Sequence, residues 1–514
     1  MRLFRMNLGQ ARARLVQAGA ALAAAALIAG CGSQYRPVVT PINPSGPAPQ
    51  PTSLAVVVSA PSSTTSGIAT ILDYSGDTVV ATAPIGIGPS AFTVDASGST
   101  GYTINSDGTL TDFPVSSNLQ AKSVNYFTLP STAEPVNLFS PSSGLLAADL
   151  CGTSSVSSVC RSVTDVFSGS PLTFKLTIPV GTTPVALVGI GSSGQRSFAI
   201  SQNISSPSGV ECNASPTTVT VNGEVDTLES NNTVSARIPV GVCPVYGVET
   251  SDAKRLFVLN RGSDTVSVIN VQSDTLDDQC PAPTGCVNQA GQTYFSHPSL
   301  PLSTNAGLAQ DANKDVPKVA GPVYAEYNAA TNQLVVADYD GGTISIIDVT
   351  LDEYGNDSAT FGTTYTVPVG KNPASVTVLV DGSRAYTANQ VEQTVSIVNM
   401  SSGNHTLEKT LSVVGHPRTV VSTQNSSYGK VYVGSPDSPY VTIIRTDQDI
   451  VDTTILVQGN VVDVRVQYQN ATSGNSNTTS RVPGYGQPCN QPGLPATTGT
   501  QTELQACQQL PLAQ

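Results

Sequence analysis

One hairpin pattern returns three times in this chain, and it constrains the fold more than any other feature. It reads RLFVLNRGSDTVSVINV from Arg255 to Val271, QLVVADYDGGTISIIDV from Gln333 to Val349, and RAYTANQVEQTVSIVNM from Arg384 to Met400. In each copy, β-branched and aromatic residues meet polar turn formers and then an alternating Thr-Val/Ile-Ser-Val/Ile stretch, which is typical of a β-hairpin. A hairpin repeated along a chain predicts a solenoid or a propeller.

A proline stands at the head of each repeat, where it precedes a strand and removes no ladder hydrogen bond. These prolines recur at intervals of about 44 to 78 residues, as Pro89, Pro135, Pro184, Pro244, Pro322, Pro373 and Pro417. After the proline come an alternating stretch, an Asp-Gly or Ser-Gly turn, the hairpin and a closing strand. Four strands in each repeat predict one propeller blade per repeat.

The two ends of the repeat region are incomplete in a complementary way. Ser53 to Ile87 supplies three strands without an opening strand, and Val461 to Gln467 is an opening strand with no blade after it. Pairing them closes a ring and removes exposed sheet edges. We therefore expect an all-β propeller of four-stranded blades, with eight blades, or seven if one degenerate N-terminal repeat is not a blade.

The second strand of the hairpin repeat has a recurring tetrapeptide. Tyr386-Thr387-Ala388-Asn389 and Tyr102-Thr103-Ile104-Asn105, followed by the Thr-Val-Ser stretch in the first case, resemble the YVTN β-propeller repeat family of bacterial and archaeal surface and periplasmic proteins. The match is close from Pro244 to about Gly459. Asp338 replaces the asparagine in one copy and Gly434-Ser435 in another, which indicates a turn rather than a ligand position. The resemblance implies the fold but no reaction.

The first thirty residues are typical of a bacterial lipoprotein signal peptide. A basic segment with four arginines precedes the apolar stretch 15–30, which is too short to be interpreted first as a spanning helix. Ile28-Ala29-Gly30-Cys31 resembles a lipobox, which implies cleavage before Cys31 and acylation of this cysteine. Position 32 is Gly and not Asp, which in the enterobacterial sorting rule indicates the outer membrane. Several acyl chains would give lasting anchorage.

Composition divides the rest of the chain and limits its partners. Residues 31–53 are a lipidated cysteine and Pro-rich tether, 54–468 the propeller, and 469–514 a low-complexity tail. The net charge of −13 becomes about −17 once the four signal arginines are removed. This charge argues against nucleic acid as a partner and against electrostatic docking on anionic lipid. Attachment to the membrane is therefore expected through the lipid anchor. The remaining partner is a protein, a peptide or a small polar ligand.

Eight cysteines remain after Cys31, an even number that predicts disulfides in an exported chain. Sequence alone does not fix their connectivity, but pairing of neighbours is the economical arrangement. The expected pairs are Cys151 with Cys160, Cys212 with Cys243, Cys280 with Cys286, and Cys489 with Cys507. The spacings match no zinc motif, and we expect no metal.

Ligand contacts are expected where the innermost strands begin, because these positions surround one mouth of a propeller. The residues before the blade prolines gather there with two tyrosines of the repeated Pro-Val-Tyr, so the candidates are Thr183, Tyr246, Tyr324, Lys371, Asn372 and His416, with Cys243 at the same repeat position. A cation, an imidazole, amides and aromatic faces suit a small polar or peptide ligand. The alternative is that Lys371 and His416 are solvated turn residues.

Two insertions lengthen their repeats: Ser201 to Ser230 and Ser273 to Lys318. They are either binding loops or variable surface loops without a binding role. The three histidines fit no metal or haem motif, and no nucleophile elbow is present. We therefore expect no catalytic residues and no cofactor, and a cell-envelope binding or interaction scaffold. The alternatives are a lactonase-like or quinoprotein-like enzyme with a metal or cofactor in the central channel, and a structural surface protein.

Overall fold

The fold was analysed in a computed structural model of the chain. The structure describes residues 54–141, 144–150, 162–190, 196–204, 212, 217–302, 319–401, 405–423 and 429–467. All of them belong to one compact unit, Pro49–Gln514. The expected signal peptide, the acylated Cys31, the tether, the tail, and the pairs Cys151 with Cys160 and Cys489 with Cys507 lie outside the described residues.

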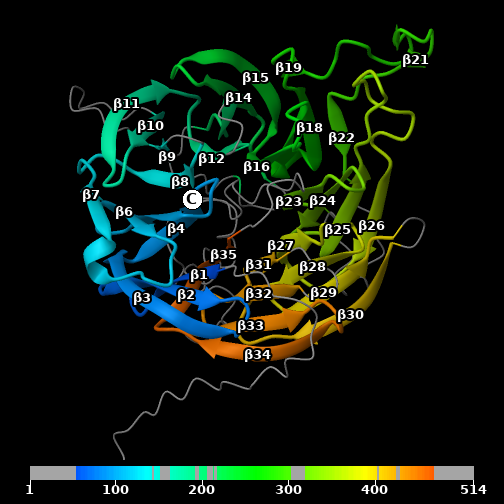
Figure 1. The fold of residues 1–514 in the computed structure, drawn as a ribbon. Coiled ribbons are helices and arrows are strands. Elements are labelled where there is room, and N and C mark those ends of the chain that lie inside the picture. Colours follow the sequence, from blue (N-terminus) through cyan, green and yellow to red (C-terminus); the bar gives the residue numbers. More distant parts are fainter. Residues whose placement is uncertain are drawn as a thin grey trace, which may run out of the picture. The chain divides into compact units, whose positions relative to one another are not determined.

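Eight antiparallel sheets form the blades of a ring, and the main path of each sheet has four strands (Figure 1). Blades 1 to 4, each from its innermost strand outward, are β4 (Pro89–Val94), β5 (Thr100–Asn105), β6 (Thr109–Pro114) and β7 (Asn125–Thr128); β8 (Pro135–Phe139), β9 (Leu145–Asp149), β10 (Val163–Ser168) and β11 (Thr173–Pro179); β12 (Pro184–Gly189), β13 (Arg196–Ser201), β14 (Asn222–Glu229) and β15 (Val234–Val242); and β16 (Pro244–Glu249), β17 (Arg255–Asn260), β18 (Thr265–Asn270) and β19 (Thr275–Leu276). Blades 5 to 7 are β23 (Pro322–Asn328), β24 (Gln333–Asp338), β25 (Thr343–Asp348) and β26 (Thr364–Pro368); β27 (Pro373–Val378), β28 (Arg384–Asn389), β29 (Thr394–Asn399) and β30 (Thr406–Ser412); and β31 (Thr419–Ser422), β32 (Lys430–Gly434), β33 (Tyr440–Arg445) and β34 (Ile450–Leu456).

The eighth blade joins the two ends of the described chain. Its innermost strand is β35 (Asn460–Val466), which pairs with β1 (Leu54–Ala60), followed outward by β2 (Ser66–Asp73) and β3 (Thr78–Ile87). The orange β35 lies beside the blue β1 in Figure 1. Neighbouring innermost strands contact one another all the way round, from β4 through β8, β12, β16, β23, β27 and β31 to β35, which contacts β4. The prediction of eight blades in a closed ring is therefore confirmed.

The core lies between blades, because alternate residues of each strand face the neighbouring sheet. The largest apolar cluster runs through blades 3 to 6 and includes Phe198, Phe257, Val336 and Val376, one from each blade and none measurably exposed. Apart from the 3-10 turns η1 (Ala121–Ser123) and η3 (Arg261–Ser263), the elements in the described ranges are strands. Of those residues, no helix is long and apolar enough to cross a membrane.

The recurring asparagine of the second strand holds the third strand of its own blade. Asn389 Nδ2 donates to Oγ1 of Thr394 at 3.0 Å and to Oγ of Ser396 at 2.8 Å. Asn260 makes the same pair of bonds, and Asn105 bonds two threonines in the same way. Thr-x-Ser therefore follows asparagine in this repeat because the two hydroxyls receive its amide protons. This position stabilises the hairpin.

Asp338 occupies the same position in blade 5 with the direction of the bonds reversed. The hydroxyls of Thr343 and Ser345 donate to Asp338 Oδ2 at 3.0 and 2.7 Å. The side chain is fully buried, and burial raises the pKa of Asp338 to about 7 despite these two bonds. The departure from asparagine thus places a titrating carboxyl at a buried position that holds a neutral amide in blades 1, 4 and 6.

Candidate functional site

All innermost strands begin at the same end of the ring, called here the head face. The residue before the blade proline has a left-handed backbone in five blades: Gly88, Thr183, Cys243, Gly321 and Asn372, with φ between 52° and 62°. Such a φ is rare for a β-branched residue like Thr183. Because the conformation recurs at one repeat position, it belongs to the fold and orients the chain into the innermost strand.

The predicted candidates Thr183 and Asn372 lie at this face and make hydrogen bonds to the chain nearby. Thr183 is buried, and its Oγ1 donates to the carbonyl of Ile204 at 3.0 Å. Asn372 Nδ2 donates to the carbonyl of Tyr339 at 3.2 Å, which links blade 6 to blade 5. Lys371 is exposed beside it.

His416 is held from two blades. Its Nδ1 lies 2.6 Å from Asp437 Oδ2, and its backbone N–H donates to the other carboxylate oxygen at 2.8 Å. Gln393 Nε2 donates to His416 Nε2 at 3.0 Å, so Nδ1 carries the proton that is given to Asp437. His416 is therefore buried rather than solvated, and both of its ring nitrogens have partners.

Tyr246 and Tyr324 occupy equivalent positions on β16 and β23. Their ring centroids are 4.8 Å apart, the planes are inclined by 25°, and both residues are buried. The stack joins blades 4 and 5. The same repeat position bridges other blades through hydrogen bonds, since Ser375 Oγ accepts from Val420 N and Thr419 Oγ1 donates to Asp463.

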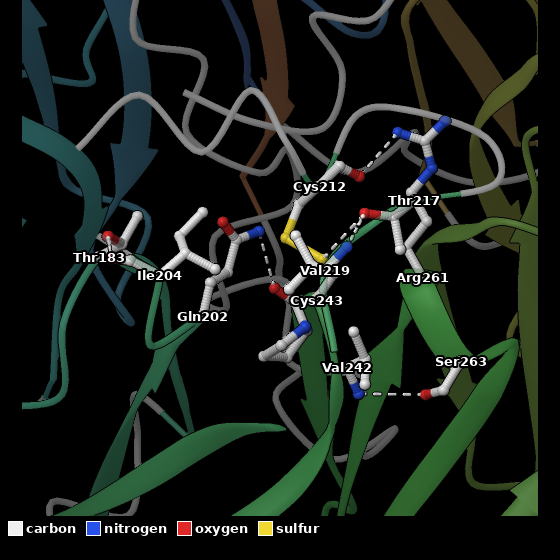
Figure 2. The surroundings of a disulfide bond; sticks show 11 residues. Thr183, Gln202, Ile204, Cys212, Thr217, Val219, Val242, Cys243, Arg261 and Ser263 are labelled. Atoms are coloured by element: carbon white, nitrogen blue, oxygen red, sulfur yellow. Dashed lines mark hydrogen bonds between the residues drawn. A yellow bond between two sulfur atoms is a disulfide. The ribbon is translucent and has the colours of Figure 1, made fainter. Parts of the chain in front are cut away.

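The first insertion is fastened to the head of blade 4 by a disulfide, as predicted (Figure 2). Cys212 and Cys243 lie 31 residues apart in sequence, and Cys243 directly precedes Pro244. Arg261 Nη1 donates to the carbonyl of Cys212 at 3.4 Å, and the same guanidinium holds Asp340 of blade 5 at 2.9 Å. This part of the head face is therefore cross-linked covalently and ionically.

The second insertion divides the outer strand of blade 4. β19 pairs with one end of β18 and β22 (Ser299–Pro301) with the other, and the short β20 (Cys286–Val287) and β21 (Thr293–Tyr294) lie between them in sequence. The predicted Cys280–Cys286 disulfide is present. His297 Nδ1 lies 2.8 Å from Asp357 of blade 5, which also accepts from Arg255 at 3.0 Å.

Two buried carboxyls, Asp277 of the second insertion and Asp357 of blade 5, meet at Arg255 of blade 4. Arg255 Nη2 also lies 3.3 Å from Asp277, and burial, followed by the charge of Asp357, raises the pKa of Asp277 to about 6. These contacts attach the insertion to two blades. Across the ranges that the structure describes, no group of three or more His, Cys, Asp or Glu side chains could hold a metal.

A cavity of about 270 Å³ opens at the head face where the heads of β31, β35 and β4 meet. The lining combines hydroxyl, amide, apolar and one cationic side chain; its residues are Ala60, Pro61, Ser62, Ser63, Gly88, Arg418, Pro436, Asn460, Val461 and Val462. Its volume lies just below the usual range of ligand pockets, roughly 300 to 1,000 Å³. The cavity therefore suits a small molecule.

Arg418 is the charged residue of this lining and is about 1% exposed. Its Nη2 donates to the carbonyl of Val462 at 3.0 Å, and its own carbonyl accepts from Ser375 Oγ at 2.8 Å. Asp463, which follows Val462 in β35, pairs with Arg465 at 2.8 Å. Burial raises the pKa of Asp463, while first Arg465 and then Arg418 oppose that rise.

Sequence reasoning placed its candidates at the head face but missed this cavity. His416 is only two residues from Arg418 in sequence, yet none of the six predicted ligand contacts lines the cavity. Comparing repeats would have found Arg418, because the residue after the blade proline is buried and uncharged in the other repeats, as Ser90, Val136, Val185, Val245, Val323 and Ala374. Ser62 and Ser63 carry no sequence signal, since they lie in a Ser/Thr-rich turn.

No family model and no curated protein matches the sequence. Among solved structures, apo AztD from Citrobacter koseri is 10% identical with a TM-score of 0.51, over 81% of this chain and 98% of that chain. Dihydro-heme d1 dehydrogenase NirN in complex with DHE is 13% identical with a TM-score of 0.51, over 85% and 78%. Periplasmic gluconolactonase PpgL from Pseudomonas aeruginosa is 13% identical with a TM-score of 0.46, over 81% and 99%. At these identities the likeness shows the propeller fold alone.

Proposed function

We propose that the chain is a lipid-anchored binding protein of the bacterial cell envelope, built from YVTN-type repeats, and that it binds a small molecule in the head-face cavity. The observation that carries the proposal is the cavity itself, which is formed where the heads of three innermost strands meet. Its floor is rigid, because Val461 and Val462 are buried and belong to the strand that closes the ring. A rigid scaffold loses little conformational entropy when it binds a ligand.

Two further observations favour binding over chemistry at this face. Both ring nitrogens of His416 have partners, so this imidazole is not positioned as a base toward the cavity. The side chains that line the cavity are hydroxyls, an amide, a guanidinium and apolar groups, which orient a ligand without transferring a proton near neutral pH. In this proposal, the acylated Cys31 and the Pro-rich tether attach the propeller to the envelope membrane.

Native mass spectrometry of protein extracted in detergent from its host tests both the lipid anchor on Cys31 and ligand binding in the cavity. The expected chain begins at an acylated Cys31 and, after equilibration with the small-molecule extract of the host, carries a stoichiometric adduct. The variant Ser63→Trp should fill the exposed rim of the cavity, keep the acyl groups and lose the adduct. An unacylated chain refutes the anchor. Failure to find an adduct, or the same adduct on Ser63→Trp, refutes the cavity as the binding site.

A further inference from the structure

Four ionisable side chains meet where the second insertion leaves blade 4 and returns to it. Asp277 follows β19 at the start of the insertion, and His297 precedes β22 near its end. Arg255 belongs to β17 of blade 4, and Asp357 lies between β25 and β26 of blade 5. These four residues, called here the root cluster, therefore join both roots of the insertion to two blades.

Asp357 is the centre of the root cluster, and its side chain is fully buried. Its Oδ2 accepts the backbone N–H of His297 at 3.1 Å and lies 2.8 Å from His297 Nδ1. Its Oδ1 accepts from Arg255 Nη2 at 3.0 Å, and the same Nη2 lies 3.3 Å from Oδ2 of Asp277. One guanidinium nitrogen thus serves two buried carboxyls.

The charges of the root cluster balance when it holds one additional proton. With both carboxyls ionised and a neutral imidazole, two negative charges face the single positive charge of Arg255. An unbalanced charge is costly in a buried place. A proton on Asp277 removes the excess and lets this carboxyl donate to Asp357, with which it interacts. Because the two carboxyls interact, they release that proton as a unit.

The direction of the pH effect follows from Asp277. Burial, followed by the charge of Asp357, raises the pKa of Asp277 to about 6, although Arg255 and Asn270 oppose the rise. An aspartate in an unfolded chain has a pKa of about 3.9. The attached insertion therefore holds a proton that a detached one releases. The stabilisation from this proton is complete below about pH 4 and is lost as the pH rises through about 6.

The other charged groups on the packed segments lie nearer to solvent, where their fields are screened. Lys254, next to Arg255 in sequence, pairs with Asp252 at 3.6 Å. The charged side chains of these segments outside the root cluster, all exposed or half-buried, are Asp252, Lys254, Asp278, Asp348, Asp352 and Glu353. His297 connects the cluster to solvent, because its side chain is 35% exposed while its ring stacks on Phe361.

We propose that the root cluster is a proton-dependent latch, which holds the second insertion against blade 5 at mildly acidic pH and loosens its two roots above neutral pH. A single proton controls both roots, because Asp277 and His297 contact the same carboxyl of Asp357. The latch lies on blades 4 and 5 and the head-face cavity on blades 7, 8 and 1, so each can be present without the other.

Hydrogen exchange of the full chain at pH 5 and pH 8, corrected for the intrinsic effect of pH on exchange, tests the latch. We expect the protection factors of the protected amides in residues 277–298 to fall about tenfold from pH 5 to pH 8. In Asp277→Asn, an amide that does not titrate can still donate to Asp357, so the protection should not change with pH. The matched control Asp278→Asn removes an exposed carboxyl next to it and should keep the tenfold fall.

A fluorescent reporter gives a second measurement of the same loosening. The chain contains no tryptophan, so Tyr294→Trp in β21 places a single indole inside the insertion. Acrylamide should quench it more at pH 8 than at pH 5, and equally at both when Asp277→Asn is added. Equal protection at the two pH values in the natural chain overturns the inference without any variant. A pH dependence that persists in Asp277→Asn overturns it as well.

Discussion

Ending the chain after Gly459 removes β35, and we expect this variant to lose its cooperative unfolding transition. The lost strand carries four buried valines: Val461, Val462, Val464 and Val466. Burying one such side chain stabilises a protein by roughly 1.5 to 3 kcal/mol, so the four contribute about 6 to 12 kcal/mol. That is comparable to the total stability of a typical domain, about 5 to 15 kcal/mol.

The deletion also opens the ring. β35 pairs with β1 and contacts the innermost strands β31 and β4 on either side, so its loss exposes one strand edge and two blade faces. The matched control ends after Gln467, whose backbone N–H donates to the carbonyl of Leu54 and which therefore keeps the whole closure. Thermal unfolding followed by circular dichroism compares the two. Equal melting temperatures would show that the ring does not depend on this strand.

Replacing Asp338 by asparagine should increase stability, and more so at higher pH. The folded pKa of Asp338 is about 7, against about 3.9 in an unfolded chain, so the folded state retains a proton that the unfolded state releases between these values. The free energy of unfolding of the natural chain therefore falls as pH rises from about 4 to about 7. The amide introduced by Asp338→Asn would not titrate and would donate to Thr343 and Ser345, as Asn389 does to its own hydroxyls.

The expected result is a stability gap between Asp338→Asn and the natural chain that widens by up to about 4 kcal/mol between pH 4 and pH 8, measured by urea unfolding. Burial also raises the pKa values of Glu249 and Asp226, to about 8 and about 6. These two groups titrate alike in both proteins, so their contributions cancel in the difference between the two unfolding free energies. The reciprocal variant Asn389→Asp should make the free energy of unfolding fall further with rising pH than it does in the natural chain. A gap that does not change with pH would contradict the assignment.

The fold could be predicted from the sequence because short local sequence patterns mark each repeat. The proline heads, the Asn to Thr-x-Ser hairpins and the complementary ends each specify one step of the architecture, and together they gave eight blades closed by β35. The disulfides Cys212–Cys243 and Cys280–Cys286 followed from closeness in sequence. What local patterns cannot show is how side chains pack where the heads of neighbouring blades meet.

The candidate site depends on that missing information. Tyr246 and Tyr324 are conspicuous in sequence, but packing turns them toward each other as a link between blades. Ser63 lies hundreds of residues from Arg418 and Asn460, and only closure of the ring brings the three to one cavity. The one sequence signal for the cavity was Arg418, a charged residue at a repeat position that is uncharged in the other repeats.

Hydrogen exchange with mass spectrometry, with and without the small-molecule extract of the host, tests most directly whether the head-face cavity is the ligand site. The account predicts slower exchange in three segments that surround the cavity, residues 60–66, 418–422 and 460–466, and no change in the second insertion at 277–298. The Ser63→Trp variant, which should fill the rim of the cavity, should show no such protection. Protection confined to the second insertion, or unchanged exchange in all three segments, would contradict the account.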